Sequence, residues 1–222
     1  MIKAGNRAVI FDLDGTLLDT SPGSIDSVNY TIKNLGLKSL GSEELYSFVG
    51  PPIQESFRNH FNMDESAALN AAGLFRRYYK EHSLFMADEY PGVMDLLAAL
   101  KSRNYAIAVA TYKREDYAMS LLEHFGIAQY CDSIHGADDA CVRTKTDIVA
   151  MCMQDLSASP NESIMIGDSE HDAQGAEKLG IRFIGVGYGF GFKSLADISK
   201  FRHIGYVHAV SELLPIITQI GN

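Results

Sequence analysis

The sequence predicts an α/β protein, a doubly wound parallel sheet with a small α-helical domain inserted after the first strand. Three observations carry this prediction. The apolar run Ala8–Phe11 ends in Asp12 and Asp14, as a buried parallel strand ends at the ligand-binding edge of a sheet. Residues 22–86 show helical spacing without strand-like alternation. From residue 93 onward, short apolar runs alternate with helical segments, which is typical of a parallel sheet.

The inserted domain, placed at residues 19–87, is expected to form about four helices. Apolar residues recur at helical spacing before the glycine stop at Gly36, and Pro52 is well placed to begin another helix. The expected helices are 24–35, a short one opening at 42, 52–61 and 64–82.

The core domain is expected to contain residues 1–18 and 88–222. Its strands after the first are expected at 105–111, 133–135, 163–166, 182–186 and 206–210. Helices are expected at 93–103, 115–125, 147–156, after Asp168 as far as Leu179, and at the C-terminus.

Composition limits the possible functions. The 222 residues are 46% hydrophobic, enough for one or two domains with a good core. A formal net charge of -9 argues against nucleic-acid binding, and no apolar run is long enough to span a membrane. The three cysteines, without CxxC spacing, predict reduced thiols without a catalytic role in a cytoplasmic protein. An acidic chain that handles an anion needs a metal or local positive charge.

Polar residues with complementary chemistry fall where the predicted strands end. They are Asp12 and Asp14, Thr111, Lys145 just before a helix, and Asp168 with Asp172. Because parallel strands end at one edge, these side chains are expected to meet there. Carboxylates from two strands can hold Mg²⁺, while a hydroxyl and an ammonium group suit phosphate oxygens.

These residues, together with Gly167-Asp168-Ser169-Glu170-His171-Asp172, resemble the four motifs of the haloacid dehalogenase superfamily of phosphohydrolases. The inserted helices resemble its small helical cap on a Rossmann-like core. Tyr90-Pro91-Gly92-Val93 and Gly50-Pro51-Pro52 are similar to segments of the phosphoglycolate phosphatase-like branch. The resemblance therefore implies a phosphoric monoester hydrolase that acts on a small phosphorylated metabolite.

The resemblance also implies a role for each residue. Asp12 would be the nucleophile that forms an aspartyl-phosphate, and Asp14 would protonate the leaving group and then activate water. Mg²⁺ would be held by Asp12, the Asp14 backbone carbonyl and Asp168, with Asp172 as a supporting acid. Thr111 and Lys145 would bind the phosphate oxygens.

Several alternatives stay open. The substrate is expected to be phosphoglycolate, with nucleotide monophosphates or pyrophosphate as alternatives. Two other functions stay open: a phosphomutase, which would pass the phosphoryl group to a sugar rather than to water, and a non-enzymatic module that binds phosphate and regulates. Arg143 could serve in place of Lys145. The loop Gly187–Gly191 is expected to line the cleft rather than cradle phosphate, and His171 to be an exposed helix residue. The cap is expected to select the substrate; a monomer and a homodimer are equally compatible.

Overall fold

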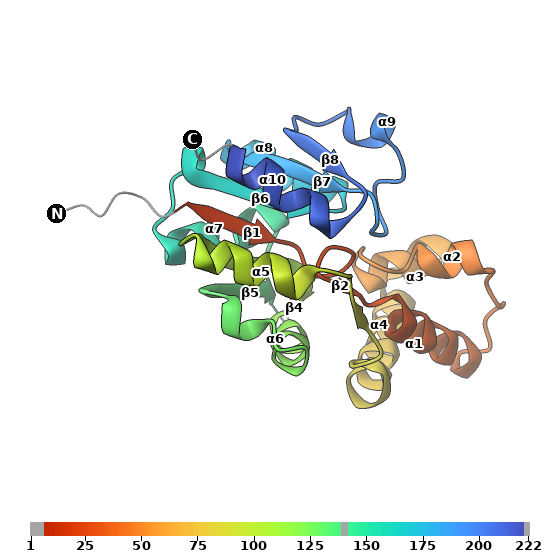
Figure 1. Ribbon diagram of the computed structural model, residues 1–222. Helices are drawn as coiled ribbons and strands as arrows, with labels where there is room; N and C mark the ends of the chain where they lie inside the picture. The colour runs from red at the N-terminus through yellow and green to blue at the C-terminus, as the bar shows by residue number, and fades with distance from the viewer. Residues whose placement is uncertain (1–6, 139–141, 220–222) are drawn as a thin grey trace. The chain divides into compact units, whose positions relative to one another are not determined.

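The computed structural model describes residues 7–138 and 142–219, and it divides the chain into two compact units (Figure 1). Residues 1–18 and 89–222 form one, called here the α/β unit, and residues 19–88 form the other, the helical unit. The chain crosses between them in β2 (Leu18–Asp19) and β3 (Asp88–Glu89), which pair in a separate two-stranded sheet.

The α/β unit is built on a six-stranded parallel sheet with the order β5-β4-β1-β6-β7-β8. Its strands are β1 (Ala8–Phe11), β4 (Ala106–Arg114), β5 (Ser133–Ala137), β6 (Ser163–Gly167), β7 (Arg182–Val186) and β8 (Gly205–Val207). The central strand β1 places Phe11 beside Val109 of β4 and Ile166 of β6. This sheet confirms the predicted doubly wound fold.

Helices connect the strands and cover the sheet. They are α5 (Val93–Ser102), α6 (Glu115–His124), α7 (Lys145–Leu156), α8 (Glu170–Leu179), α9 (Leu195–Ile198) and α10 (Leu213–Gln219), with short 3₁₀ turns at Ala128–Tyr130, Pro160–Glu162 and Val210–Glu212. All four residues of β1 are buried, so both faces of the sheet are covered. One face, with Ile10 and Met165, packs on apolar residues of α7 and α8 such as Ile148 and Ala173.

Two element boundaries differ from the sequence prediction in ways that concern the site. Strand β4 continues three residues beyond Thr111, because Arg114 pairs with Ala137 of β5 after a shift in register. Helix α7 begins at Lys145, two residues earlier than expected. The Asp147 carboxylate accepts hydrogen bonds from the backbone and hydroxyl of Thr144 at 2.8 and 2.7 Å, a capping box that starts the helix.

The helical unit contains α1 (Ser21–Asn34), α2 (Ser42–Tyr46), α3 (Ile53–Phe61) and α4 (Glu65–Tyr78). Its core contains Val28 and Ile32 of α1, Phe57 of α3 and Ala71 of α4. A π-helical turn, Tyr79–Ser83, follows α4 where the sequence predicted a continuous α-helix.

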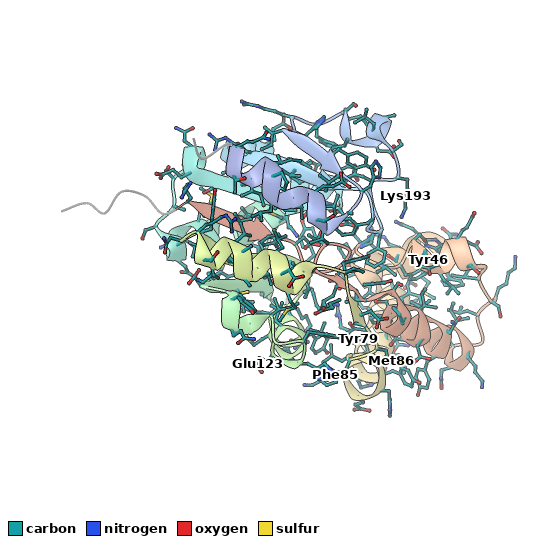
Figure 2. The ribbon with its side chains drawn as sticks, viewed as in Figure 1. Tyr46, Tyr79, Phe85, Met86, Glu123 and Lys193 are labelled. Carbon is teal, nitrogen blue, oxygen red and sulfur yellow. The ribbon has the colours of Figure 1, made fainter. Side chains whose placement is uncertain are left out.

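Large apolar side chains of the helical unit also reach its surface. Tyr46, Phe85 and Met86 are 51%, 49% and 44% exposed (Figure 2). Among the described helices of the whole chain, none is both long and apolar enough to cross a bilayer.

Candidate active site

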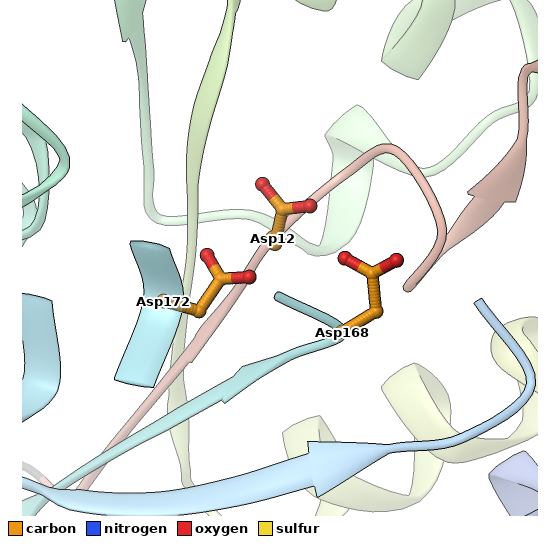
Figure 3. A group of neighbouring side chains, drawn as sticks. All are labelled: Asp12, Asp168 and Asp172. Carbon is orange, nitrogen blue, oxygen red and sulfur yellow. The ribbon is translucent and has the colours of Figure 1, made fainter. Parts of the chain in front are cut away.

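The candidate site lies at the carboxyl ends of β1 and β6 and the N-terminus of α7. Asp12 directly follows β1, and its backbone N–H donates to the carbonyl of Ile166 at 2.9 Å, so it is fixed by the sheet. Asp168 directly follows β6, and Asp172 lies in the first turn of α8. The three carboxylates converge (Figure 3), with one ligand oxygen from each lying within 4.8 Å of the others.

Lys145 lies between two of these acids. Its Nζ is 2.5 Å from Asp12 Oδ1 and 2.7 Å from Asp172 Oδ1, and all three residues are buried. The first residue of α7 thereby brings a positive charge to the end of β1. Arg143, the alternative considered from the sequence, points elsewhere: its Nη1 donates to Glu115 at 3.2 Å and to the carbonyl of Gly136 at 3.2 Å.

Asp172 helps to hold this arrangement. Its Oδ2 accepts hydrogen bonds from the backbone N and the hydroxyl of Ser169 at 3.1 and 2.6 Å, forming a capping box at the start of α8. Its other oxygen faces Lys145. The neighbouring His171 contacts the Tyr112 ring edge-on, and it is partly buried rather than fully exposed.

The glycine-rich loop after β7 positions Asp168. The backbone N–H groups of Phe190 and Gly191 donate to Asp168 Oδ2 at 2.6 and 3.0 Å. A Cβ on Gly189 would lie 2.5 Å from Asp168 Oδ2 and would overlap the carbonyl of Gly15. The loop needs glycine because its backbone packs directly on the acid, and these two amides bind a carboxylate rather than forming a phosphate cradle.

Burial and neighbouring charges raise the pKa values of Asp168 and Asp12. Burial, and then the neighbouring Asp172, raises the pKa of Asp168 to about 7, against the opposing effect of the loop amides and Lys145. Burial raises the pKa of Asp12 well above its ordinary value, and Lys145 only partly offsets burial and the nearby aspartates. For Lys145, burial favours the neutral amine, but Asp12 and Asp172 outweigh it and raise its pKa.

A hard cation fits this set of donors. Lys145 contacts two of the three buried carboxylates, so a divalent ion bound by oxygen would offset the negative charge that remains. Asp12 and Asp168 directly follow strands β1 and β6, while both oxygens of Asp172 already contact Ser169 or Lys145. The supporting role of Asp172 stays a prediction.

The other two residues selected from the sequence have different partners. Asp14 lies two residues after Asp12, and its Oδ1 is 3.0 Å from Lys113 Nζ. Thr111 is buried near the end of β4, and its Oγ1 accepts a hydrogen bond from the backbone N of Lys113 at 3.1 Å. Sequence reasoning missed Lys113. The sequence offered one sign of it: Lys113 follows the Thr111 hydroxyl by two residues, at the end of a predicted strand.

Fold and site together define an enzyme of phosphoryl chemistry, in which carboxylates and a lysine meet at the carboxyl edge of a parallel sheet. Residues 9–186 match the family model described as haloacid dehalogenase-like hydrolase. The chain belongs to this family, and it is a phosphoric monoester hydrolase.

Several known proteins are similar over most of the chain. A 5'-nucleotidase of Pseudomonas aeruginosa is 33% identical over 82% of this chain and 83% of its own length. A phosphoglycolate phosphatase of Chromobacterium violaceum is 31% identical over 95% and 96%, and a tyrosine-protein kinase PtkA of Mycobacterium tuberculosis is 34% identical over 93% and 71%. The solved structure of a predicted phosphatase from Clostridium acetobutylicum has a TM-score of 0.89 and 36% identity, covering 97% of this chain and all of that one.

Proposed function

We propose that this protein is a Mg²⁺-dependent phosphatase that hydrolyses a small phosphorylated metabolite, phosphoglycolate or a close analogue, through an aspartyl-phosphate on Asp12. The observation that carries the proposal is the buried Asp12 carboxylate, 2.5 Å from Lys145 at the end of the central strand. A buried carboxylate repels a phosphate group unless it forms a bond to phosphorus or binds a cation. The proposal gives Asp12 both roles, nucleophile and Mg²⁺ ligand.

The residues divide the reaction into two displacements. In the first, an Asp12 oxygen attacks phosphorus, the bond from phosphorus to the ester oxygen breaks, and that oxygen takes a proton from Asp14. In the second, Asp14 takes a proton from water, the water oxygen attacks the phosphorus of the aspartyl-phosphate, and the bond to Asp12 breaks. Inorganic phosphate leaves, and both carboxyl groups return to their starting states.

The neighbouring groups stabilise negative charge on the transferring phosphoryl group. Lys145 is assigned to its equatorial oxygens, with the Thr111 hydroxyl as a second donor, because phosphoryl transfer depends mainly on positioning and charge. Asp12, Asp168 and the Asp14 backbone carbonyl would hold Mg²⁺, with Asp172 in support. When bound, the ion supplies charge neutralisation and orients the phosphate.

The helical unit is proposed to act as the cap that selects the leaving group. The phosphoglycolate phosphatase of C. violaceum supports phosphoglycolate as the substrate. The 5'-nucleotidase of P. aeruginosa supports nucleotide monophosphates as the second candidate. The free thiols of Cys131 and Cys152 support a reducing, cytoplasmic location.

A substrate panel tests the proposal. Purified protein is assayed for phosphate release from phosphoglycolate, nucleotide monophosphates, pyrophosphate and p-nitrophenyl phosphate, with Mg²⁺ and with a chelator. We expect Mg²⁺-dependent release that is abolished in Asp12→Asn, while circular dichroism shows the fold unchanged. Turnover by Asp12→Asn near the wild-type rate would overturn the assignment of the nucleophile.

A further inference from the structure

The two lysines of the site are each paired with a different acid. Lys145 is paired with Asp12, the proposed nucleophile, whereas Lys113 Nζ lies 3.0 Å from Oδ1 of Asp14, the proposed proton donor. Both side chains of the second pair are nearly enclosed, with 10% and 13% of their surface exposed. A cation therefore lies beside the acid on the leaving-group side of the reaction, separate from the cation beside the nucleophile.

An irregularity in β4 brings Lys113 to this position. Ala110 lies opposite His135 of β5, but the next paired residues are Arg114 and Ala137, so four residues of β4 advance against two of β5. Extra residues in one strand bend it and redirect its side chains, and such bulges often occur beside active sites. Lys113 lies within this bulge, and its backbone N–H donates to Thr111 Oγ1.

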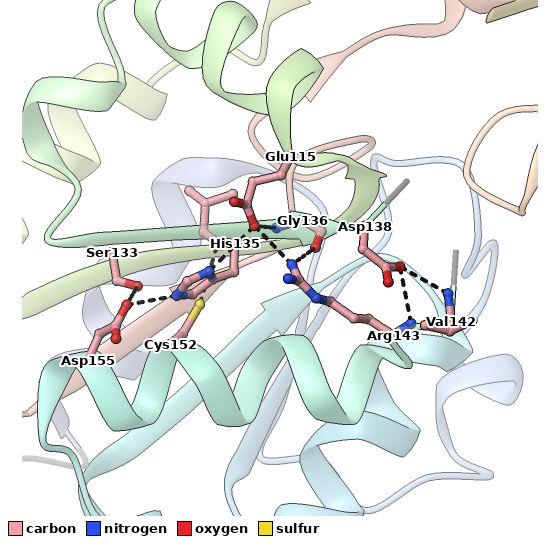
Figure 4. A network of polar contacts seen from close by, with 10 residues as sticks. Glu115, Ser133, His135, Gly136, Asp138, Val142, Arg143, Cys152 and Asp155 are labelled. Carbon is pink, nitrogen blue, oxygen red and sulfur yellow. Dashed lines mark hydrogen bonds and ion pairs between the residues drawn. The ribbon is translucent and has the colours of Figure 1, made fainter. Parts of the chain in front are cut away.

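The bulge is held in place by a polar network from neighbouring elements (Figure 4). Glu115 Oε2 accepts hydrogen bonds from Gly136 N at 3.1 Å and from Arg143 Nη1 at 3.2 Å. His135 Nδ1 is 3.5 Å from the same oxygen, and its Nε2 is 2.7 Å from Asp155 of α7. A Cβ on Gly136 would lie 2.5 Å from the Lys113 carbonyl oxygen. Lys113 is thus carried on a backbone fixed by β5, α6 and α7.

The position of the ammonium determines what it can bind. If Asp14 protonates the leaving oxygen, that oxygen comes within about 3 Å of the carboxyl group. Lys113 Nζ is 3.0 Å from Asp14 Oδ1, so it lies within about 6 Å of a leaving oxygen that takes its proton from that same atom. An anionic group two or three bonds from the leaving oxygen comes within ion-pairing distance. The leaving group of a simple alcohol or a nucleoside places no such charge there.

We propose that Lys113 is a specificity residue that selects phosphate esters or anhydrides whose leaving group carries its own negative charge close to the bridging oxygen. This inference rests on the proposed function. The negative charge on the leaving group is then either the carboxylate of a short hydroxy acid or the second phosphate of pyrophosphate. Without Lys113, such a charge would enter a site already containing several aspartates and would be repelled.

A matched pair of substrates tests the proposal. Phosphoglycolate and 2-hydroxyethyl phosphate differ only in that a carboxylate replaces a neutral CH₂OH group. The preference of an enzyme is the ratio of its kcat/KM values for the two. We expect wild type to prefer phosphoglycolate, and Lys113→Met to reduce that preference by about 10- to 100-fold, as expected for a hydrogen bond to a charged group. The loss should appear mainly in KM for phosphoglycolate. Lys113→Arg should retain part of the preference.

Lys101→Met is the matched control. Lys101 also forms an ion pair with an aspartate, Asp132, at 2.8 Å, but it lies on α5 outside the site, so its loss should leave the preference unchanged. Pyrophosphate serves as a second anionic substrate and should also lose rate relative to 2-hydroxyethyl phosphate in Lys113→Met.

The outcomes separate this inference from the proposed function. Equal losses on both substrates in Lys113→Met would reduce Lys113 to a support for Asp14 and overturn the inference. The inference would also be overturned if the wild-type enzyme hydrolysed p-nitrophenyl phosphate with Mg²⁺ but showed no preference for phosphoglycolate over 2-hydroxyethyl phosphate. In that case the proposed phosphatase activity would still stand. Absence of Mg²⁺-dependent hydrolysis of every ester tested would overturn both.

Discussion

Replacing Gly189 with alanine tests whether the glycine-rich loop positions Asp168. The added Cβ would lie 2.5 Å from both Cβ and Oδ2 of Asp168. Carbon atoms in contact prefer separations near 3.5 Å, so loop and acid must move apart by about 1 Å. The bonds from Phe190 N and Gly191 N, now 2.6 and 3.0 Å, would stretch to or past the limit for N–H···O bonds, about 3.2 Å.

The expected consequences follow from these distances. Each lost hydrogen bond to a carboxylate costs about 1.5–3 kcal/mol, so we expect the affinity for Mg²⁺ to fall at least about tenfold. A displacement of about 1 Å of a site residue is expected to lower kcat by roughly 100-fold. Overpacking should reduce the free energy of unfolding by about 1–3 kcal/mol.

The assay measures hydrolysis of p-nitrophenyl phosphate against Mg²⁺ concentration, together with calorimetric Mg²⁺ binding and urea unfolding. Gly73→Ala in α4 is the control, because a Cβ there meets no atom within 4 Å and alanine should stabilise the helix by up to about 1 kcal/mol. If Gly189→Ala binds Mg²⁺ and turns over substrate like wild type, the loop does not position Asp168.

Three further predictions concern the site and the thiols. Lys145→Met should lower the free energy of unfolding by about 3–5 kcal/mol, because it leaves buried carboxylates without their cation; an unchanged urea midpoint would contradict this. Burial raises the pKa of Asp168 to about 7, so its carboxyl group is protonated below that pH, and calorimetry should show Mg²⁺ affinity falling by at least about tenfold per pH unit below 7. An affinity that does not change between pH 5.5 and 8 would contradict this. Burial raises the pKa values of Cys131 and Cys152 to about 12, so about one thiol in 10⁴ is ionised at pH 8. In a Cys141→Ser variant, iodoacetamide should therefore label these two thiols slowly until urea unfolds the protein. Rapid labelling of the folded protein would contradict the burial of these thiols.

Site residues whose position depends only on the direction of a strand could be predicted from the sequence. Asp12 and Asp168 follow buried apolar runs, and parallel strands put their carboxyl ends at one edge, so the meeting of these acids needed no knowledge of packing. The same holds for Lys145, since it opens the helix after β5. For β1 and β6, local apolar patterning is sufficient because the apolar run and the strand end together.

What escaped prediction depends on contacts between segments far apart in the chain. The extension of β4 to Arg114 results from pairing with Ala137 beyond a bulge, and hydrophobic spacing carries no record of such a shift. The amides that hold Asp168 come from a loop more than twenty residues later. Likewise, only packing decides that Arg143 turns to Glu115 while Lys145 turns to Asp12. The order of helices and strands could be deduced from the sequence, but the ion-pair partner of each charged side chain could not.

The pairing of β2 with β3 has an implication for how such proteins diversify. The segment between them leaves and re-enters the α/β unit through adjacent strands, so its two ends are neighbours whatever its length. Insertions of this kind are tolerated because they impose no stretch on the host fold. Evolution, or a protein engineer, can therefore exchange residues 20–87 for another module while the register of the six-stranded sheet and the acids at its edge stay as they are. The helical unit and the acids at the sheet edge can then change independently of each other.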